Sequence, residues 1–142
     1  MYEYNVTVTK VVDGDTVDVD IDLGFGMTYK KQRVRLMGID TPESRTRDLV
    51  EKLFGKASKK HLKELLSGGG ITLVSHDKGK FGRILGELYV EGKSINQQMI
   101  DEYHAVDYAG GNKEEIQEQH MKHRVLLIEQ GVVTQEQIDK VS

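Results

Sequence analysis

The segment from Arg35 to Glu43 concentrates residue types that could hold a metal ion and an anion. It contains one guanidinium, the carboxylates of Asp40 and Glu43, and the only proline of the chain. Pro42 directs Thr41 into an extended conformation, which would leave the Thr41 carbonyl free of strand pairing between the two carboxylates. Two carboxylates and a carbonyl form a set of hard oxygen ligands that suits Ca²⁺. The same residues also fit a helix start, with Thr41 as the cap and Pro42 at the first helical position, so both interpretations stay open.

Two shorter segments carry similar residue types and are less specific. Asp13-Gly-Asp-Thr16 offers two carboxylates, but an Asp-Gly pair is most often a tight turn between strands. Lys80-Phe-Gly-Arg83 offers two cations, but a glycine before an arginine is common where a hairpin turn leads into a strand. Neither segment identifies a site by itself.

Two other patterns suggest metal sites that the residues do not support. The acids from Asp18 to Asp22 alternate as in a calcium-binding EF-hand loop, but Leu23 and Tyr29 stand where such a loop needs a glycine and a glutamate. These acids are expected on the solvent face of a strand. His120 and His123 lie on one stripe of a predicted helix, and we expect them to be partly buried or interfacial rather than zinc ligands.

The composition is typical of a globular protein, with 142 residues, a net charge of −3 and no cysteine. The absence of cysteine excludes disulfides and thiolate metal sites. Between Lys30 and Lys63, eleven Lys and Arg residues outnumber four Asp and Glu residues. Such an excess suits a polyanion, although it is also common on a solvated face. No apolar run approaches a membrane span and residues 1–10 lack the apolar core of a signal peptide, so we expect a cytoplasmic chain, or a secreted one if a signal has been removed.

Alternating apolar residues predict three antiparallel strands in the first third of the chain. The inward-facing positions are Val6, Val8, Val17, Val19, Ile21, Leu23, Val34 and Leu36. Their period of two buries one face of each strand. Turns are expected at Asp13-Gly14 and at Gly24-Phe25-Gly26, while Arg33 and Arg35 are expected on the face opposite the core.

The rest of the chain alternates between helical and strand patterns. The stripe that predicts the first helix consists of Val50, Leu53, Phe54, Ala57, His61 and Leu65. Glycines 68–70 should end this helix. Residues 71–75 and 83–90 are expected to be strands, followed by helices over 94–103, capped by Ser94, and over 113–130. Gly110-Gly111 should separate these two helices, and a short last helix is expected from Thr134.

The order of these elements predicts a fold. Three strands, a helix, two strands and further helices indicate an α+β protein built on a five-stranded OB-fold barrel. The helix lies between strands three and four, and the remaining helices follow at the C-terminus. The face of such a barrel commonly receives oligonucleotides. We expect one domain over residues 1–142.

Taken together, Asp13–Thr16, Arg35–Glu43 and Lys80–Arg83 resemble the staphylococcal nuclease (thermonuclease) family in order and approximate spacing, and the resemblance covers nearly the whole chain, from about Val6 to Gly131. It implies a Ca²⁺-dependent nuclease that hydrolyses phosphodiester bonds of DNA and RNA and leaves 3′-phosphate ends. The expected partner is single-stranded or denatured DNA and RNA. We expect the protein to act as a monomer and not to bind a membrane.

The resemblance also implies roles for the residues that match. Asp15 and Asp40 would bind Ca²⁺ through their carboxylates, and Thr41 through its main-chain carbonyl. Glu43 would position and deprotonate the attacking water. These are the oxygen ligands and the base that such a hydrolysis needs.

The remaining roles concern the substrate. Arg35 and Arg83 would bind the scissile phosphate and stabilise the transition state. Lys80 and Tyr108 would bind the rest of the nucleic acid, and Tyr108 is the candidate for the family's base-stacking tyrosine. The chain departs from the family at Phe81, where a tyrosine is usual, and it lacks the tryptophan typical near the C-terminus. These differences concern the preference for substrate ends and the C-terminal packing.

A catalytically silent OB-type module that binds nucleic acid or a protein is the alternative. Such a module would be expected to lose Asp15, Asp40, Glu43 or one of the arginines. All of them are present, which favours the enzyme, although the fold alone does not determine function.

Overall fold

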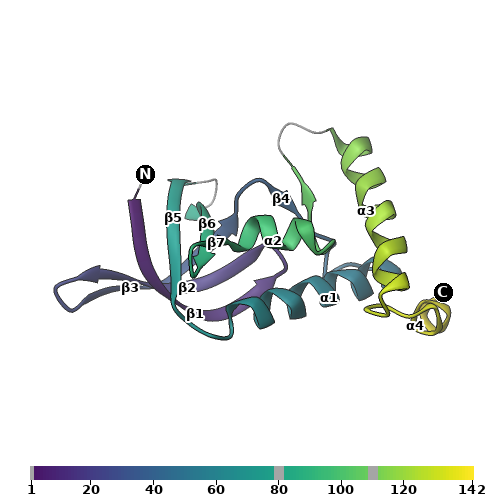
Figure 1. Ribbon diagram of the computed structural model, residues 1–142, viewed down its shortest axis with the longest axis horizontal. Coiled ribbons are helices and arrows are strands. Elements are labelled where there is room, and N and C mark those ends of the chain that lie inside the picture. The colour runs from purple at the N-terminus through teal and green to yellow at the C-terminus, as the bar shows by residue number, and fades with distance from the viewer. Residues whose placement is uncertain (1, 79–81, 109–111) are drawn as a thin grey trace.

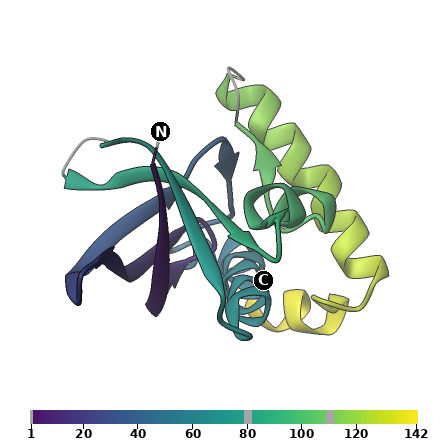
Figure 2. The same cartoon turned by 60° about the vertical axis from the view of Figure 1, so that its left-hand side comes forward.

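The computed structural model describes residues 2–78, 82–108 and 112–142 (Figure 1). Its elements, in chain order, are β1 (Tyr2–Asp13), β2 (Thr16–Gly24), β3 (Met27–Leu36), β4 (Ile39–Asp40), α1 (Leu49–Leu66), β5 (Ile71–Lys78), β6 (Ile84–Val90), β7 (Lys93–Ser94), α2 (Ile95–Asp101), β8 (Val106–Asp107), α3 (Lys113–Glu129) and α4 (Gln135–Val141). The barrel strands lie on one side of the molecule and α3 and α4 on the other (Figures 1 and 2). Within the described ranges, no helix is long and apolar enough to cross a membrane.

Five strands close into a barrel. The order β3-β2-β1-β5-β6 is antiparallel throughout, and the short β7 extends it beyond β6. A parallel pairing of β3 with β6, in which Arg35 lies opposite Leu85, joins the two ends. Because α1 is inserted between the third and fourth strands of this barrel, the expected α+β OB-fold is confirmed.

The alternation in β2 separates the barrel interior from its surface. Val17 and Val19 are fully buried, whereas Asp18 and Asp20, which alternate with them, are partly exposed. The interpretation of these acids as the outer face of a strand is therefore confirmed. The barrel core also contains Val6, Val11, Ile21, Val34, Leu36, Leu62, Leu73 and Leu88. Burial of one such side chain contributes about 1.5–3 kcal/mol to the free energy of unfolding. The alternation of apolar and polar residues therefore largely determines which face of the strand turns inward.

The prediction that Leu23 faces the core is wrong. Its side chain is 45% exposed, and Phe25 and Met27 beside it are exposed as well. The β2–β3 hairpin extends past the rest of the barrel (Figure 1). Among the described residues, the pairing of β1 with β2 ends at Ile21 and no other strand covers the tip of the hairpin. The alternation therefore continues along β2 but buries no side chain there.

The first helix begins later than Thr41 and Pro42, so the interpretation of these residues as a helix start is also wrong. Asp40 is paired in β4, and α1 begins at Leu49 with Asp48 as its cap. The Asp48 Oδ1 accepts hydrogen bonds from the main-chain nitrogens of Val50 (3.1 Å) and Glu51 (3.0 Å). These bonds satisfy first-turn donors that a helix leaves unpaired.

Helix α1 connects two apolar clusters. In its first half, Phe54 is fully buried and packs with Leu127 of α3 and with Val133. In its second half, Leu62 and Leu66 belong to the barrel core. The helical stripe predicted from the sequence is confirmed, and it holds the C-terminal helices against the barrel.

Most other boundaries agree with the predictions. The Ser94 Oγ accepts a hydrogen bond from the Gln97 nitrogen (3.2 Å), which confirms the predicted cap of α2, and Thr134 caps α4. Strand β5 continues to Lys78 rather than ending at Ser75, and β6 begins at Ile84 rather than at Arg83. The two-residue strands β4, β7 and β8 have no counterpart among the predictions. Residues 79–81 and the predicted separator at 110–111 lie outside the described residues.

Two histidine rings stack where α1 meets the segment that follows α2. The ring centroids of His61 and His104 are 4.2 Å apart, with an angle of 18° between the planes. His104 is 4% exposed. Burial, followed by the charges of His61 and His123, lowers the pKa of His104 from 6.5 to about 4, although the carboxylate of Glu102 opposes the shift.

We expect His104 to make the free energy of unfolding depend on pH. The unfolded chain takes up a proton at this histidine as the pH falls through 6.5, whereas the folded protein does so only near 4. The stabilisation is therefore complete above pH 6.5 and is lost as the pH falls, by about 2 kcal/mol between pH 7 and pH 5. Urea unfolding at both pH values should show a smaller loss for His104→Phe than for the parent protein. Equal losses would contradict this account of the histidine.

Candidate functional site

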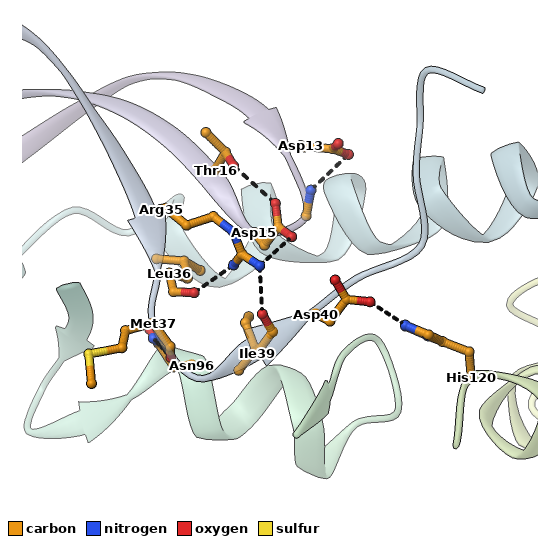
Figure 3. A network of polar contacts seen from close by, with 11 residues as sticks. Asp13, Asp15, Thr16, Arg35, Leu36, Met37, Ile39, Asp40, Asn96 and His120 are labelled. Atoms are coloured by element: carbon orange, nitrogen blue, oxygen red, sulfur yellow. Dashed lines mark hydrogen bonds and ion pairs between the residues drawn. The ribbon is translucent and has the colours of Figure 1, made fainter. Parts of the chain in front are cut away.

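Arg35 lies at the end of β3, where the chain leaves the barrel, and its guanidinium is fixed on three sides. Its Nη1 donates to the Leu36 carbonyl (2.7 Å), and its Nη2 donates to the Ile39 carbonyl (2.9 Å). The same Nη2 is 3.4 Å from the Asp15 Oδ2 in an ion pair. Figure 3 shows the side chain reaching towards Asp15 and towards the main chain that leads to Asp40. These contacts fix the guanidinium in place before any ligand arrives.

Asp15 is placed beside Arg35 by the pairing of β2 with β3. Thr16 lies opposite Arg35 in this pairing, and the Leu36 nitrogen donates to the Asp15 carbonyl (2.8 Å). The Thr16 hydroxyl donates to the Asp15 Oδ1 (3.0 Å). The turn predicted at Asp13-Gly14 therefore also serves the site, because it presents Asp15 to the end of β3.

Asp40 and Thr41 lie next to Arg35 and Asp15 in the candidate site. Asp40 lies opposite Val106 in the pairing of β4 with β8, whereas Thr41 follows the strand and is 6% exposed. The segment that leads into β4 is held by Asn96, whose Nδ2 donates to the Met37 carbonyl (2.9 Å). The pairing of the short strands β4 and β8 thus determines where the main chain presents the Asp40 carboxylate.

His120, on α3, contacts the Asp40 carboxylate directly. Its Nε2 is 2.7 Å from the Asp40 Oδ2, and its side chain is 11% exposed (Figure 3). The expectation of a partly buried histidine is confirmed, but the sequence did not indicate its partner. This contact links the last long helix to the candidate site.

Glu43 is positioned by α1. Its main-chain nitrogen donates to the Glu51 Oε2 (3.0 Å). Gly55 lies so close to this segment that a Cβ atom there would be 2.2 Å from the Glu43 carbonyl oxygen and 2.6 Å from the Ser44 nitrogen. Only a glycine lets the helix approach the main chain of Glu43 this closely.

The carboxylates of the site repel one another. Burial raises the pKa of Asp15, with further contributions from Asp13 and Asp40, although Arg35 and Thr16 lower it. Burial also raises the pKa of Glu43, and the charges of Asp13 and Asp15 act in the same direction. Each acid therefore lies within electrostatic range of several others, with Arg35 as the ion-paired cation beside them.

The residues fit a hard divalent cation. In the parts of the chain that the structure describes, no three His, Asp or Glu side chains group into a complete metal cluster. The candidate ligands are two carboxylates, those of Asp15 and Asp40, with the carbonyl of Thr41. Their oxygen chemistry and mutual repulsion suit Ca²⁺, whose flexible coordination also accepts water and substrate oxygens.

Three other predicted residues are less closely connected with this set. Arg83 immediately precedes β6 and is partly buried, and its side chain forms no hydrogen bond or ion pair with any described residue. Tyr108 is 51% exposed and lines a cavity together with Asp40 and Glu43. Lys80 lies outside the described residues.

Some residues that shape the site were missed because only the fold brings them there. Asp13 and Glu51 add negative charge, and Gly55 and His120 position Glu43 and Asp40. A signal for His120 was present in its helix. It belongs to a stripe of polar residues at helical spacing, where a helix that packs against protein usually carries apolar ones.

Comparison with known proteins identifies relatives of this chain. A family model described as "Staphylococcal nuclease homologue" matches residues 33–139. The chain is 35% identical over 102 residues to "Endonuclease YncB" of Bacillus subtilis (strain 168), which covers 69% of this chain and 45% of that protein. It is 34% identical over 94 residues to an "Uncharacterized endonuclease" of Escherichia coli, which covers 66% of this chain and 54% of the relative.

A plant relative is similar over a shorter region. The chain is 33% identical over 77 residues to "Probable staphylococcal-like nuclease CAN1" of Oryza sativa subsp. japonica, which covers 54% of this chain and 22% of that protein. The chain thus spans about half or less of the length of these relatives. The region matched by the family model nevertheless includes most of the chain, from Arg33 through β4 and α1 to α4. This match, together with the OB-fold barrel, shows that the chain belongs to the staphylococcal nuclease family.

Proposed function

We propose that residues 1–142 form one domain that acts as a Ca²⁺-dependent nuclease and hydrolyses phosphodiester bonds of DNA and RNA. The observation that carries the proposal is the convergence of Arg35, Asp15, Asp40, Thr41 and Glu43 at one end of the barrel. A phosphodiester is an anion, so its hydrolysis needs positive charge beside the group that activates water. The endonuclease and nuclease names of the relatives point to the same chemistry.

Glu43 is the proposed general base. Partial desolvation and the neighbouring acids raise its pKa, which makes its carboxylate a stronger base than that of an isolated glutamate. It would take a proton from the attacking water as the water oxygen bonds to phosphorus. The bond from phosphorus to the 5′ oxygen would then break, and this oxygen would take up a proton from solvent. The products would carry a 3′-phosphate and a 5′-hydroxyl.

Arg35 and Arg83 are proposed to bind the phosphate oxygens. A guanidinium matches two phosphate oxygens with two parallel hydrogen bonds, and its charge counters the charge that develops at phosphorus. Asp15, Asp40 and the Thr41 carbonyl would hold Ca²⁺, which supplies Lewis-acid stabilisation of the same oxygens when bound. The contacts of Arg35 with Leu36 and Ile39 keep its donors in position before the substrate arrives.

The proposed substrate is single-stranded or denatured nucleic acid, bound by a monomer. The face of such a barrel binds an extended nucleic-acid strand through the charge of its phosphates and the stacking of its bases, and both are largely independent of sequence. Lys80 and Tyr108 are proposed to contact the strand beyond the scissile phosphate.

A cleavage assay with purified protein tests this proposal. We expect single-stranded DNA and RNA to be cut with Ca²⁺, only weakly with Mg²⁺, and not at all with chelator, because a sparse oxygen set suits Ca²⁺ better than octahedral Mg²⁺. Product ends should become extendable by a polymerase only after phosphatase treatment, since the 3′ end carries phosphate. Glu43→Gln, purified identically, controls for a contaminating nuclease. Full activity in chelator would rule out the metal assignment, and absence of cleavage under every condition would favour a silent binding module.

A further inference from the structure

We propose that the cavity between the Asp40–Glu43 segment and α3 is a second nucleotide subsite, which holds the nucleotide on the side of the scissile bond away from Arg83. This inference rests on the proposed function. The cavity has a volume of about 400 Å³, within the usual range for a small-molecule site. Asp40 and Glu43 line one of its walls, so it opens directly onto the candidate catalytic residues.

The opposite wall is a polar stripe of α3. Lys113, Gln117, His120 and Arg124 all line the cavity, and their spacing of three or four residues puts them on one face of the helix. A helix that only packed against protein would place apolar residues on this face. Ile116 is the buried apolar residue beside the stripe. The stripe therefore offers donors and positive charge to a ligand.

His120 contacts the Asp40 carboxylate, whereas the other three side chains of the stripe have no carboxylate partner among the described residues. The side chains of Lys113 and Gln117 form no hydrogen bond or ion pair with any described residue. The Arg124 Nε is buried without a hydrogen-bond partner among these residues, and its guanidinium lies 5.1 Å from the centroid of the Phe54 ring. Arg124 is thus held by packing rather than by a carboxylate. Its charge remains available to an anion such as a phosphate.

The cavity lies where a bound nucleic-acid strand would continue beyond the scissile phosphate. β4 lies between α3 and the beginning of β6 in both views (Figures 1 and 2). Arg83 lies on the β6 side, because it immediately precedes this strand. A strand whose scissile phosphate lies at Arg35 and Asp40 would therefore have Arg83 on one side and the α3 stripe on the other. Lys113 and Arg124 would meet the next phosphate, while Pro42 and Ile116 offer apolar surface to the sugar and base.

Binding without cleavage tests the subsite. A fluorescein-labelled single-stranded oligonucleotide is titrated in Ca²⁺ with Glu43→Gln, and its affinity is read by fluorescence anisotropy. Lys113→Glu in this background should weaken binding by about tenfold, because it replaces a phosphate contact with a repulsive charge. Lys122→Glu makes the same charge change on the face of α3 opposite the stripe and should weaken binding by less than about twofold. Melting temperatures establish that each variant is folded.

The possible outcomes separate the subsite from the proposed function. Equal weakening by Lys113→Glu and Lys122→Glu, no weakening by either, or no oligonucleotide binding by Glu43→Gln would each overturn the subsite. Cleavage by the parent protein is measured separately. If the parent cleaves but the two lysine variants bind alike, the subsite is wrong and the proposed function stands. If the parent binds without cleaving, the proposed function is wrong, and the difference between the two lysines still decides the subsite.

Discussion

Arg83→Ala is expected to lower kcat by about 10²–10³ and to leave KM comparatively unchanged. Arg83 has no hydrogen bond or ion pair with the described residues, so its removal breaks no such contact of the folded protein. Its effect should therefore come from charge that develops in the transition state. Arg83→Lys should also be a poor enzyme, because an ammonium cannot form two parallel hydrogen bonds to a phosphate.

Arg33 provides the matched control for this substitution. It forms two hydrogen bonds with the Asp18 carboxylate (2.9 and 3.2 Å), and its side chain is 48% exposed. Such a surface pair contributes little, so Arg33→Ala should change activity by less than about tenfold, mainly through salt-sensitive binding. Both variants must keep the melting temperature and circular dichroism of a folded protein. Near-parental kcat in Arg83→Ala, or a larger loss in Arg33→Ala, would show that the site is assigned wrongly.

Gly55→Ala should impair both stability and activity, although it replaces glycine by the best helix former. In an open helix interior this change stabilises by about 1 kcal/mol. Here the new Cβ would lie 2.2 Å from the Glu43 carbonyl oxygen, so either α1 or the Glu43 segment must move. Overpacking of this kind typically destabilises by about 1–3 kcal/mol. A displacement of Glu43 by about 1 Å can lower the rate roughly 100-fold.

Lys56→Ala controls for the change of residue at the neighbouring position. Lys56 is exposed on the same helix, so its replacement should alter neither the melting temperature nor kcat substantially. Thermal melts and cleavage of single-stranded DNA compare the two variants. A Gly55→Ala protein that is more stable than the parent and fully active would mean that the close contact with Glu43 does not position the site.

The barrel could be predicted because apolar and polar residues alternate along its strands. Val17 and Val19 alternate with acids and are fully buried, as the period of two requires. The same rule failed at Leu23, because alternation does not show how far the neighbouring strands extend. The start of α1 was uncertain for a similar reason. Thr41 and Pro42 fit a local cap, but pairing of Asp40 with β8 keeps this segment extended.

The candidate site was predictable where its residues are neighbours in the chain. Arg35, Asp40 and Glu43 lie within one short segment, so their common position follows from the sequence. His120 is eighty residues beyond Asp40, and nothing in its local pattern identifies Asp40 as its partner. Gly55 lies within the predicted first helix, but its close contact with Glu43 is a property of the packed structure.

The pairing of β4 with β8 also determines the order in which the protein can mature. The barrel strands are all complete by Val90, whereas Asp40 gains its strand partner at Val106 and its histidine at His120. During synthesis, the barrel residues leave the ribosome before these partners do. The Asp40 carboxylate is therefore the last part of the site to be fixed. A growing chain can complete its barrel while the candidate catalytic centre is still unassembled, so folding of the scaffold and the onset of function are separate events in time.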